Sequence, residues 1–292
     1  MHTEPALCDS GAMSPVVTID ALAESLSGDA PPVLLDVRWA LGDTEGRRHY
    51  LDAHIPGAVF VDLDTELAAP GSPELGRHPL PTVADLQDAA RRWGVRAGSP
   101  VVVYDATGNL AAARAWWLLR WAGVADVSML DGGLGAWMSA GRPVRSGDEH
   151  PPLPGDVVLT AGHLPTLTAD EAAEFAADGC LLDARAAERY SGATEPIDPR
   201  AGHIPGARSV PTSENLGPDG RFAPAEALRE RFAVVGAEPG RPVGVYCGSG
   251  VTAAHQVAAL ALAGVDAALY PGSWSQWSSD PGRPVATGPD RR

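Results

Sequence analysis

A single cysteine, Cys247, heads a glycine-rich loop with the sequence CGSGV, directly after the apolar run PVGVY. A cysteine acts as a nucleophile when its sulfur is ionised, and positive charge nearby usually favours that form. The loop contains no arginine and no lysine. Gly248 and Gly250 allow a tight curl in which successive backbone N–H groups converge on the sulfur. The helix predicted to begin near Thr252 adds its positive N-terminal end. The pattern therefore predicts nucleophilic sulfur chemistry at Cys247.

Phosphate-ester hydrolysis uses a similar cysteine loop, and one position distinguishes the two chemistries. Cysteine-dependent phosphatases place an arginine six residues after the cysteine, because a bidentate guanidinium matches a phosphate. That position is Ala253 in this sequence. We therefore expect no phosphatase activity.

The other two cysteines are expected to have no catalytic role. Cys8 falls in a loose leader, and Cys180 is expected to enter a buried strand as a small hydrophobic residue. Three scattered cysteines are too few for a disulfide framework or a zinc site. Unpaired thiols suit a reducing compartment, so we expect a cytoplasmic protein.

Two apolar runs of strand length are predicted to be central strands, residues 100–105 and residues 242–247. Each precedes a turn that contains glycine and then an alanine- and leucine-rich helix, at 110–123 and at 251–264. Alternation of strands and helices indicates an α/β fold with a parallel sheet. Ligands gather beyond the carboxyl ends of such strands, which is where Cys247 lies.

The chain also repeats itself, since four sequence blocks recur in the same order in both halves. The first half carries VLLDVRW, AHIPGAVFV, VVVYDATGN and MLDGGLGAW, and the second carries CLLDARA, GHIPGARSV, VGVYCGSGV and LYPGSWSQW. We expect domain one at 16–142, an extended proline- and glycine-rich linker at 143–165, and domain two at 166–286. Each domain is predicted to have a central parallel sheet flanked by helices.

Composition excludes several classes of function. Hydrophobic residues make up 45% and charged residues 20% of the 292 residues, as in globular proteins, and the length suits two domains. The net charge of −15 argues against a nucleic-acid surface, which would be basic. No apolar run approaches the about 20 residues of a membrane helix. Residues 1–17 lack the basic flank and apolar segment of a signal peptide.

The motifs CGSGVTA, YPGSW and the two HIPGA blocks resemble those of the tandem-domain rhodanese superfamily, over about residues 16–286. The resemblance implies a sulfurtransferase whose cysteine carries sulfur as a persulfide, with no metal and no organic cofactor. The donor would be 3-mercaptopyruvate or thiosulfate, and the acceptor cyanide or a thiol, including a thioredoxin-like reductant. A Gly-Ser-Gly sequence after the cysteine is similar to the 3-mercaptopyruvate branch, whereas the thiosulfate branch carries charged residues there.

The same resemblance implies roles for individual residues. Cys247 and Ser249 would be catalytic, and Arg189 would bind the donor carboxylate. Arg185 would either contact the donor or form a structural ion pair with Asp183. The remaining loop residues expected to bind the donor are Gly248, Gly250, Val251 and Thr252.

One position departs from the mercaptopyruvate enzymes, which usually carry a second donor-binding arginine nine residues after the first. That offset gives Asp198, and the nearest arginine is Arg200. Either Arg200 replaces the missing arginine, or the pocket holds only one. Both donors therefore stay open at the level of the sequence.

Domain one is expected to be catalytically silent, because Asp105 aligns with Cys247 and a carboxylate cannot carry the transferred sulfur. Its role would be to close the active-site cleft. Trp39 matches an aromatic residue at the domain interface of the family and would wall the pocket or pack in the core.

Histidine titrates near neutrality, so His54 and His203 are candidates for proton transfer. Related enzymes suggest a relay of Ser249 with His54, oriented by Asp43 or Asp52. The alternative is a structural role in the HIPGA turn, which we expect for His203.

A different class of function also fits the resemblance, namely a sulfur-carrier or interaction module of rhodanese fold without turnover. The intact loop at Cys247 favours the enzyme, because a module would tolerate loss of the cysteine.

Overall fold

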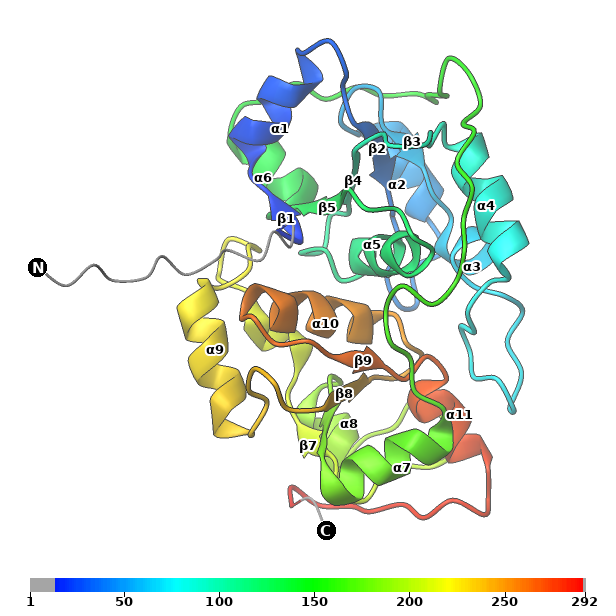
Figure 1. Ribbon diagram of the computed structural model, residues 1–292, viewed down its shortest axis with the longest axis vertical. Helices are drawn as coiled ribbons and strands as arrows, with labels where there is room; N and C mark the ends of the chain where they lie inside the picture. Colours follow the sequence, from blue (N-terminus) through cyan, green and yellow to red (C-terminus); the bar gives the residue numbers. More distant parts are fainter. Residues whose placement is uncertain (1–13, 291–292) are drawn as a thin grey trace, which may run out of the picture.

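The computed structural model describes residues 14–290, so Cys8 and most of the expected leader lie outside the described residues. The chain forms two α/β domains, drawn one above the other in Figure 1. Each domain is built on its own parallel sheet, as the sequence predicts. Within the described part of the chain, none of the helices has the length and apolar character needed to cross a bilayer.

Domain one contains a five-stranded sheet in the order β1-β5-β4-β2-β3. Its strands are β1 (Val16–Val17), β2 (Val33–Asp36), β3 (Val59–Phe60), β4 (Val101–Tyr104) and β5 (Val127–Leu130). Its helices are α1 (Ile19–Leu26), α2 (Gly46–Asp52), α3 (Leu63–Glu66), α4 (Val83–Arg92), α5 (Ala112–Trp121) and α6 (Gly133–Ser139).

Domain two repeats this plan with a four-stranded sheet in the order β7-β6-β8-β9. Its strands are β6 (Cys180–Asp183), β7 (Arg208–Ser209), β8 (Val243–Tyr246) and β9 (Ala268–Leu269). Its helices are α7 (Ala169–Asp178), α8 (Ala187–Ser191), α9 (Ala225–Val234), α10 (Thr252–Leu262), α11 (Ser273–Ser279) and the 3₁₀ turn η1 (Thr212–Asn215). An isolated parallel bridge between Thr166 and Leu269 stands where β1 pairs with β5 in domain one.

The two central strands, β4 and β8, are buried along their whole length, which explains why both read as continuous apolar runs. Helices α5 and α10 follow these strands and face each other at the junction of the domains (Figure 1). One hydrophobic cluster extends from the first sheet through both helices to the second sheet. The domains therefore share a packed core at the junction, which fixes the position of one loop against the other.

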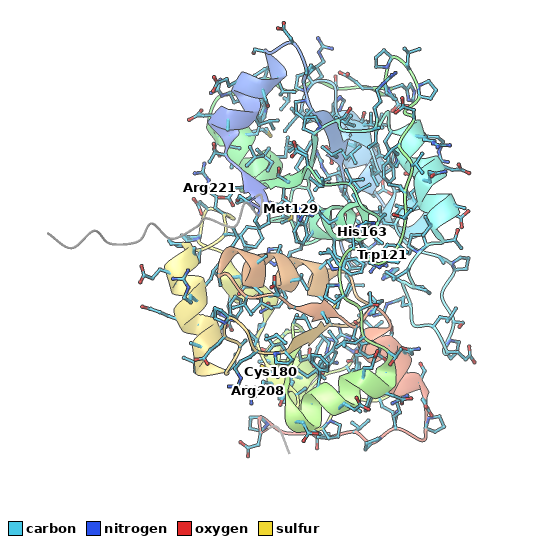
Figure 2. The ribbon with its side chains drawn as sticks, viewed as in Figure 1. Trp121, Met129, His163, Cys180, Arg208 and Arg221 are labelled. Atoms are coloured by element: carbon cyan, nitrogen blue, oxygen red, sulfur yellow. The ribbon has the colours of Figure 1, made fainter. Side chains whose placement is uncertain are left out.

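The segment between α6 and α7 contains no helix or strand in the structure, and it lies along domain one. The backbone N–H of Gly155 donates to the carbonyl of Arg91, and that of His163 donates to the carbonyl of Trp121. Figure 2 shows His163 close to Trp121 at the end of α5. These bonds hold the connection against the first domain.

The HIPGA blocks have the same structural role in both halves. His54 stacks on Tyr50 and bonds to its carbonyl oxygen through Nδ1 at 2.9 Å, and His203 does the same with Tyr190. Both histidine rings are fully buried. Because both halves repeat the arrangement, it serves the fold of each domain.

Candidate active site

Cys247 directly follows β8 and is 2% exposed, at the carboxyl end of the sheet. The backbone N–H of Gly250 donates to its Sγ at 3.2 Å. Gly250 has a φ of +79°, and a Cβ there would lie 2.5 Å from the carbonyl oxygen of Pro271. Only glycine fits this turn, which brings its amide to the sulfur. Helix α10 begins at Thr252, with its N-terminal end toward the loop.

A cavity of about 280 Å³ opens beside Cys247 and is lined by both domains. Domain one contributes Trp39, Leu41, Arg77 and Leu110. Of the residues predicted for the site, those that line it are Trp39, Arg185, Arg189, Cys247, Gly248, Ser249, Val251 and Thr252. Three other predicted residues, His54, Arg200 and Gly250, are not among the described residues that line the cavity.

Arg114, from α5 of domain one, connects the loop at Cys247 to the first domain. Its side chain is fully buried. Its Nη1 donates to the carbonyl of Gly250 at 3.2 Å, and its Nη2 donates to the carbonyls of His78 at 3.0 Å and Pro79 at 3.2 Å. Its Nε donates to the carbonyl of Leu67 at 3.2 Å. One guanidinium therefore ties the nucleophile loop to the loop that carries His78.

Arg114 supplies a buried positive charge that the sequence of the loop lacks. Burial lowers the pKa of Arg114 to about 10, while the negative charge of Cys247 acts to raise it. Arg114 is therefore cationic at neutral pH and interacts electrostatically with the sulfur. The expectation that the backbone alone must support the thiolate considered only the loop itself. Arg114, the arginine in the middle of the apolar stretch AAARAWW, was the available signal, because buried charges are rare unless they are paired or functional.

Ser249 contacts His78 rather than His54. The Oγ of Ser249 and the Nδ1 of His78 are 2.7 Å apart, and the Nε2 of His78 lies 3.3 Å from Oδ1 of Asp64. Trp39 donates from Nε1 to the same carboxylate oxygen at 3.1 Å and meets the His78 ring edge to face. The structure thus forms a Ser249–His78–Asp64 chain at the cavity, whereas His54 stacks on Tyr50 and its Nε2 lies 3.7 Å from Oε1 of Glu149.

The pKa of His78 is lowered to about 4, mainly by burial; Asp64 opposes this shift, and the positive charges of Arg114 and Arg77 add to it. The imidazole is therefore neutral near pH 7. A neutral imidazole can accept a proton from the hydroxyl of Ser249 or pass one back to it.

Arg189 and Arg77 approach the cavity from opposite domains and share one carboxylate. Arg189 donates from Nη2 to Asp198 at 2.9 Å and to Glu195 at 2.7 Å. Arg77 donates from Nη1 to the other oxygen of Asp198 at 2.7 Å. Asp198, which stands where relatives usually carry a second arginine, therefore bridges two guanidinium groups.

The other two arginines considered for the site are held in structural contacts. Arg185 forms a bidentate ion pair with Asp183 and also donates to Glu195 and to the carbonyl of Gly202. Arg200 donates to the carbonyls of Trp277 and Ser278 near the end of α11. Arg185 therefore lines the cavity, but its N–H groups are bonded to other protein groups. Arg200 lies outside the cavity.

Cys180 lies at the start of β6, paired in register with Val243 at the opposite end of the sheet from Cys247. Figure 2 shows it beside Arg208, at the far end of domain two from the domain junction. Both cysteines are buried, and Cys247 is a free thiol.

Comparison with known proteins agrees with this architecture. A family model described as a rhodanese-like domain matches residues 18–140 and again residues 168–280. The chain belongs to the rhodanese family.

Similar rhodanese relatives extend over almost the whole chain. SseB of Mycobacterium tuberculosis, named as a thiosulfate sulfurtransferase, is 50% identical over 277 residues, covering 94% of this chain and 97% of SseB. A Pseudomonas aeruginosa protein named as a 3-mercaptopyruvate sulfurtransferase is 48% identical over 284 residues, covering 94% of this chain and 98% of its own. The crystal structure of SseA from Escherichia coli, a 3-mercaptopyruvate enzyme, superposes with a TM-score of 0.78 at 33% identity, covering 90% of this chain and 99% of SseA.

These matches confirm the resemblance and the fold class predicted from the motifs. This rhodanese is a sulfurtransferase, and the family's chemistry proceeds through a cysteine persulfide.

Proposed function

We propose that this enzyme transfers sulfur from 3-mercaptopyruvate, in preference to thiosulfate, through a persulfide on Cys247. The Ser249–His78 contact of 2.7 Å beside the cysteine carries the proposal. Sulfite leaves thiosulfate as a stable anion and needs no proton. The carbon that 3-mercaptopyruvate leaves behind must be protonated, and a serine–histidine pair at the cavity can deliver that proton.

In the first half-reaction the thiolate of Cys247 attacks the donor sulfur, and the carbon–sulfur bond breaks. Its electrons remain on the pyruvate fragment as an enolate, the proton of the donor thiol moves to the methylene carbon, and pyruvate leaves. The persulfide keeps one negative charge, so charge and atoms balance. Ser249 and neutral His78 move the proton, while Asp64 orients the imidazole. Arg189 binds the donor carboxylate, and the loop residues 248–252 surround the sulfur.

In the second half-reaction an acceptor thiolate or cyanide attacks the outer sulfur of the persulfide and regenerates the thiolate of Cys247. Such a ping-pong sequence fits an acceptor that is a small thiol or a thioredoxin-like reductant. The free thiol of Cys247 suits a reducing compartment, so we place the reaction in the cytoplasm.

Intact-mass measurement tests the persulfide directly. The protein is incubated with 3-mercaptopyruvate or thiosulfate, desalted and weighed, with Cys247→Ser and Cys180→Ser as matched variants. We expect the wild type and Cys180→Ser to gain the mass of one sulfur atom that cyanide removes, and Cys247→Ser to gain none. A steady-state comparison then ranks the donors, and a higher kcat/KM for thiosulfate would contradict the proposed preference.

The alternative of a rhodanese module without turnover is set aside, because the relatives at 48% and 50% identity are named as sulfurtransferases.

A further inference from the structure

Ser273, the first residue of α11, has an unusual backbone conformation. Its φ is +53°, and among the non-glycine residues of the described part of the chain only Asn109 also has a positive φ. A residue with a side chain is strained in this left-handed region, which favours glycine and asparagine. Such strain persists where the surrounding structure enforces it, and it is concentrated at functional sites.

The equivalent position of domain one is a glycine. The repeated blocks MLDGGLGAW and LYPGSWSQW place Gly133 at the start of α6, as Ser273 stands at the start of α11. Gly133 has a similar φ of +56°, which glycine adopts without strain. The backbone turn alone therefore does not account for a serine in domain two.

The hydroxyl of Ser273 joins the nucleophile to the neighbouring strand. Its Oγ accepts from the backbone N–H of Cys247 at 3.2 Å and donates to the carbonyl of Tyr270 at 2.9 Å. One step earlier in the ladder, the backbone N–H of Tyr270 donates directly to the carbonyl of Val245. The fully buried hydroxyl thus continues the pairing of β8 and β9 as far as Cys247.

The next residue of α11 holds the other peptide group of the cysteine. The backbone N–H of Trp274 donates to the carbonyl of Cys247 at 2.9 Å. Because peptide groups are planar, fixing the groups on both sides of Cys247 also fixes the direction in which its Cα–Cβ bond leaves the strand. In domain one the N–H of Leu134 bonds to the carbonyl of Asp105 in the same way, but Gly133 has no hydroxyl for the N–H of Asp105.

We propose that Ser273 is a positioning residue for sulfur transfer, which orients the Cys247 thiolate by holding its backbone N–H. The inference rests on the proposed function in one respect, that Cys247 carries the sulfur. Ser273 acts on the nucleophile and touches no donor, so its removal should slow sulfur loading from 3-mercaptopyruvate and from thiosulfate by the same factor. Donor binding should change little.

Two substitutions separate the hydroxyl from the strain. Ser273→Gly removes both, and Ser273→Ala removes the hydroxyl but keeps the strain. Each should slow sulfur loading of the full-length protein by about 10- to 100-fold, the loss expected for a slightly misplaced reacting group. The rate is followed by intact mass at a series of donor concentrations, and the half-saturating concentration should stay within about threefold of that of the wild type.

Thermal unfolding gives the second readout. Ser273→Gly should melt about 2–4 °C above Ser273→Ala, because glycine relieves the strain. A purely structural residue would lose activity in proportion to stability, whereas we expect equal losses of activity in two variants of different stability. Ser278→Ala is the matched control, since Ser278 is buried on the same helix and its hydroxyl has no hydrogen-bond partner among the described residues. It should load sulfur like the wild type.

Loading rates in Ser273→Gly and Ser273→Ala equal to that of Ser278→Ala would overturn the proposal. A Ser273→Gly enzyme as active as this control would overturn it as well, even with an impaired Ser273→Ala, because activity would then follow strain. If Ser273→Ala does not fold, Ser273→Gly decides the question against the same control. A wild type that gains no sulfur on Cys247 would instead refute the proposed function, an outcome that involves none of these variants.

Discussion

The loops after β4 and β8 occupy equivalent places in the two domains, but they differ in how many backbone N–H groups bind the first side chain of the loop. The Asp105 carboxylate accepts four backbone hydrogen bonds of 2.7–3.1 Å, from Thr107, Asn109, Ala111 and Ala112. In the part of the chain that the structure describes, Gly250 is the only residue whose amide donates to the sulfur of Cys247. In domain one the amides of the loop bind the loop's own carboxylate. In domain two we expect the corresponding amides to bind a ligand.

The difference indicates what the second loop is built to bind. A carboxylate oxygen of Asp105 stands two bonds beyond Cβ, and so would the outer sulfur of a persulfide on Cys247. We therefore expect this sulfur to lie where the Asp105 carboxylate lies in domain one, among backbone N–H groups. On this expectation, domain one carries a carboxylate at the position that the outer sulfur of the proposed persulfide occupies in domain two.

Replacing Arg114, the cation that links the Cys247 loop to the loop of His78, should have the largest effect on activity. Arg114→Met removes the donor to four buried carbonyls, of which that of Pro79 keeps the amide of Ala69, and it removes the buried cation that interacts with the sulfur. We expect kcat/KM to fall by about a thousandfold, a loss typical of preorganised electrostatic groups, and urea unfolding to show lower stability. Arg120→Met, on the same helix and facing the surface, is the control. A folded Arg114→Met enzyme with activity close to that of the control would contradict the role of Arg114.

The histidines allow the next test. His54 and His203 occupy equivalent turns in the two domains, whereas His78 contacts Ser249 at the cavity. His78→Asn should lower kcat with 3-mercaptopyruvate by about 10²- to 10³-fold, the range of general acid–base catalysis. Sulfur loading from thiosulfate should change far less, since sulfite needs no proton. His54→Gln should mainly lower the melting temperature, because it disturbs a structural turn. Equal losses with both donors in His78→Asn would exclude a proton-transfer role.

Asp105 does not line the cavity beside Cys247, so its carboxylate can be replaced without changing that cavity. Asp105→Asn keeps the shape but replaces one acceptor oxygen by an NH₂ group, so two buried amides lose their acceptor. We expect a loss of about 1–3 kcal/mol in the free energy of unfolding, measured by urea titration, with sulfur transfer retained at temperatures where the protein is folded. Asp88→Asn, on the exposed face of α4, should be neutral. If Asp105→Asn is as stable as this control, the four bonds do not stabilise the loop.

The smallest expected effect concerns stability at acid pH, which a buried histidine of domain two and a buried carboxyl group of domain one change in opposite directions. Burial lowers the pKa of His255 in α10 to about 3, and the equivalent residue of α5 is Ala113. Between pH 6.5 and about 3 the unfolded chain binds the proton that the folded chain excludes, so this histidine makes stability fall as pH falls. Asp36 in domain one acts oppositely, because burial raises its pKa to about 6 and the folded state binds the extra proton. His255→Gln should therefore reduce the drop in melting temperature between pH 7.5 and pH 5, and an unchanged drop would contradict the assignment.

The features that local sequence determines were predictable. Continuous apolar runs indicated two buried parallel strands, and the turn after residues 242–247 indicated where Cys247 would lie. Arg114 and Arg77 were missed because they reach the loop from the other domain, a contact that no spacing within the loop reveals. His54 was considered for the relay and His78 was not, because His54 stands in a recognisable motif. That motif recurs as His203 in the second domain, and a repeated residue is better explained by the fold than by a site that exists once.

The guanidinium of Arg114 also bears on how such a chain can change over evolutionary time. A fragment cut after the linker would keep Cys247 and its glycines but would lose the cation, the imidazole and one of the arginines that domain one contributes. The half without a nucleophile is thus an indispensable part of a composite centre. We therefore expect that deleting or exchanging either domain alone would dismantle the active site.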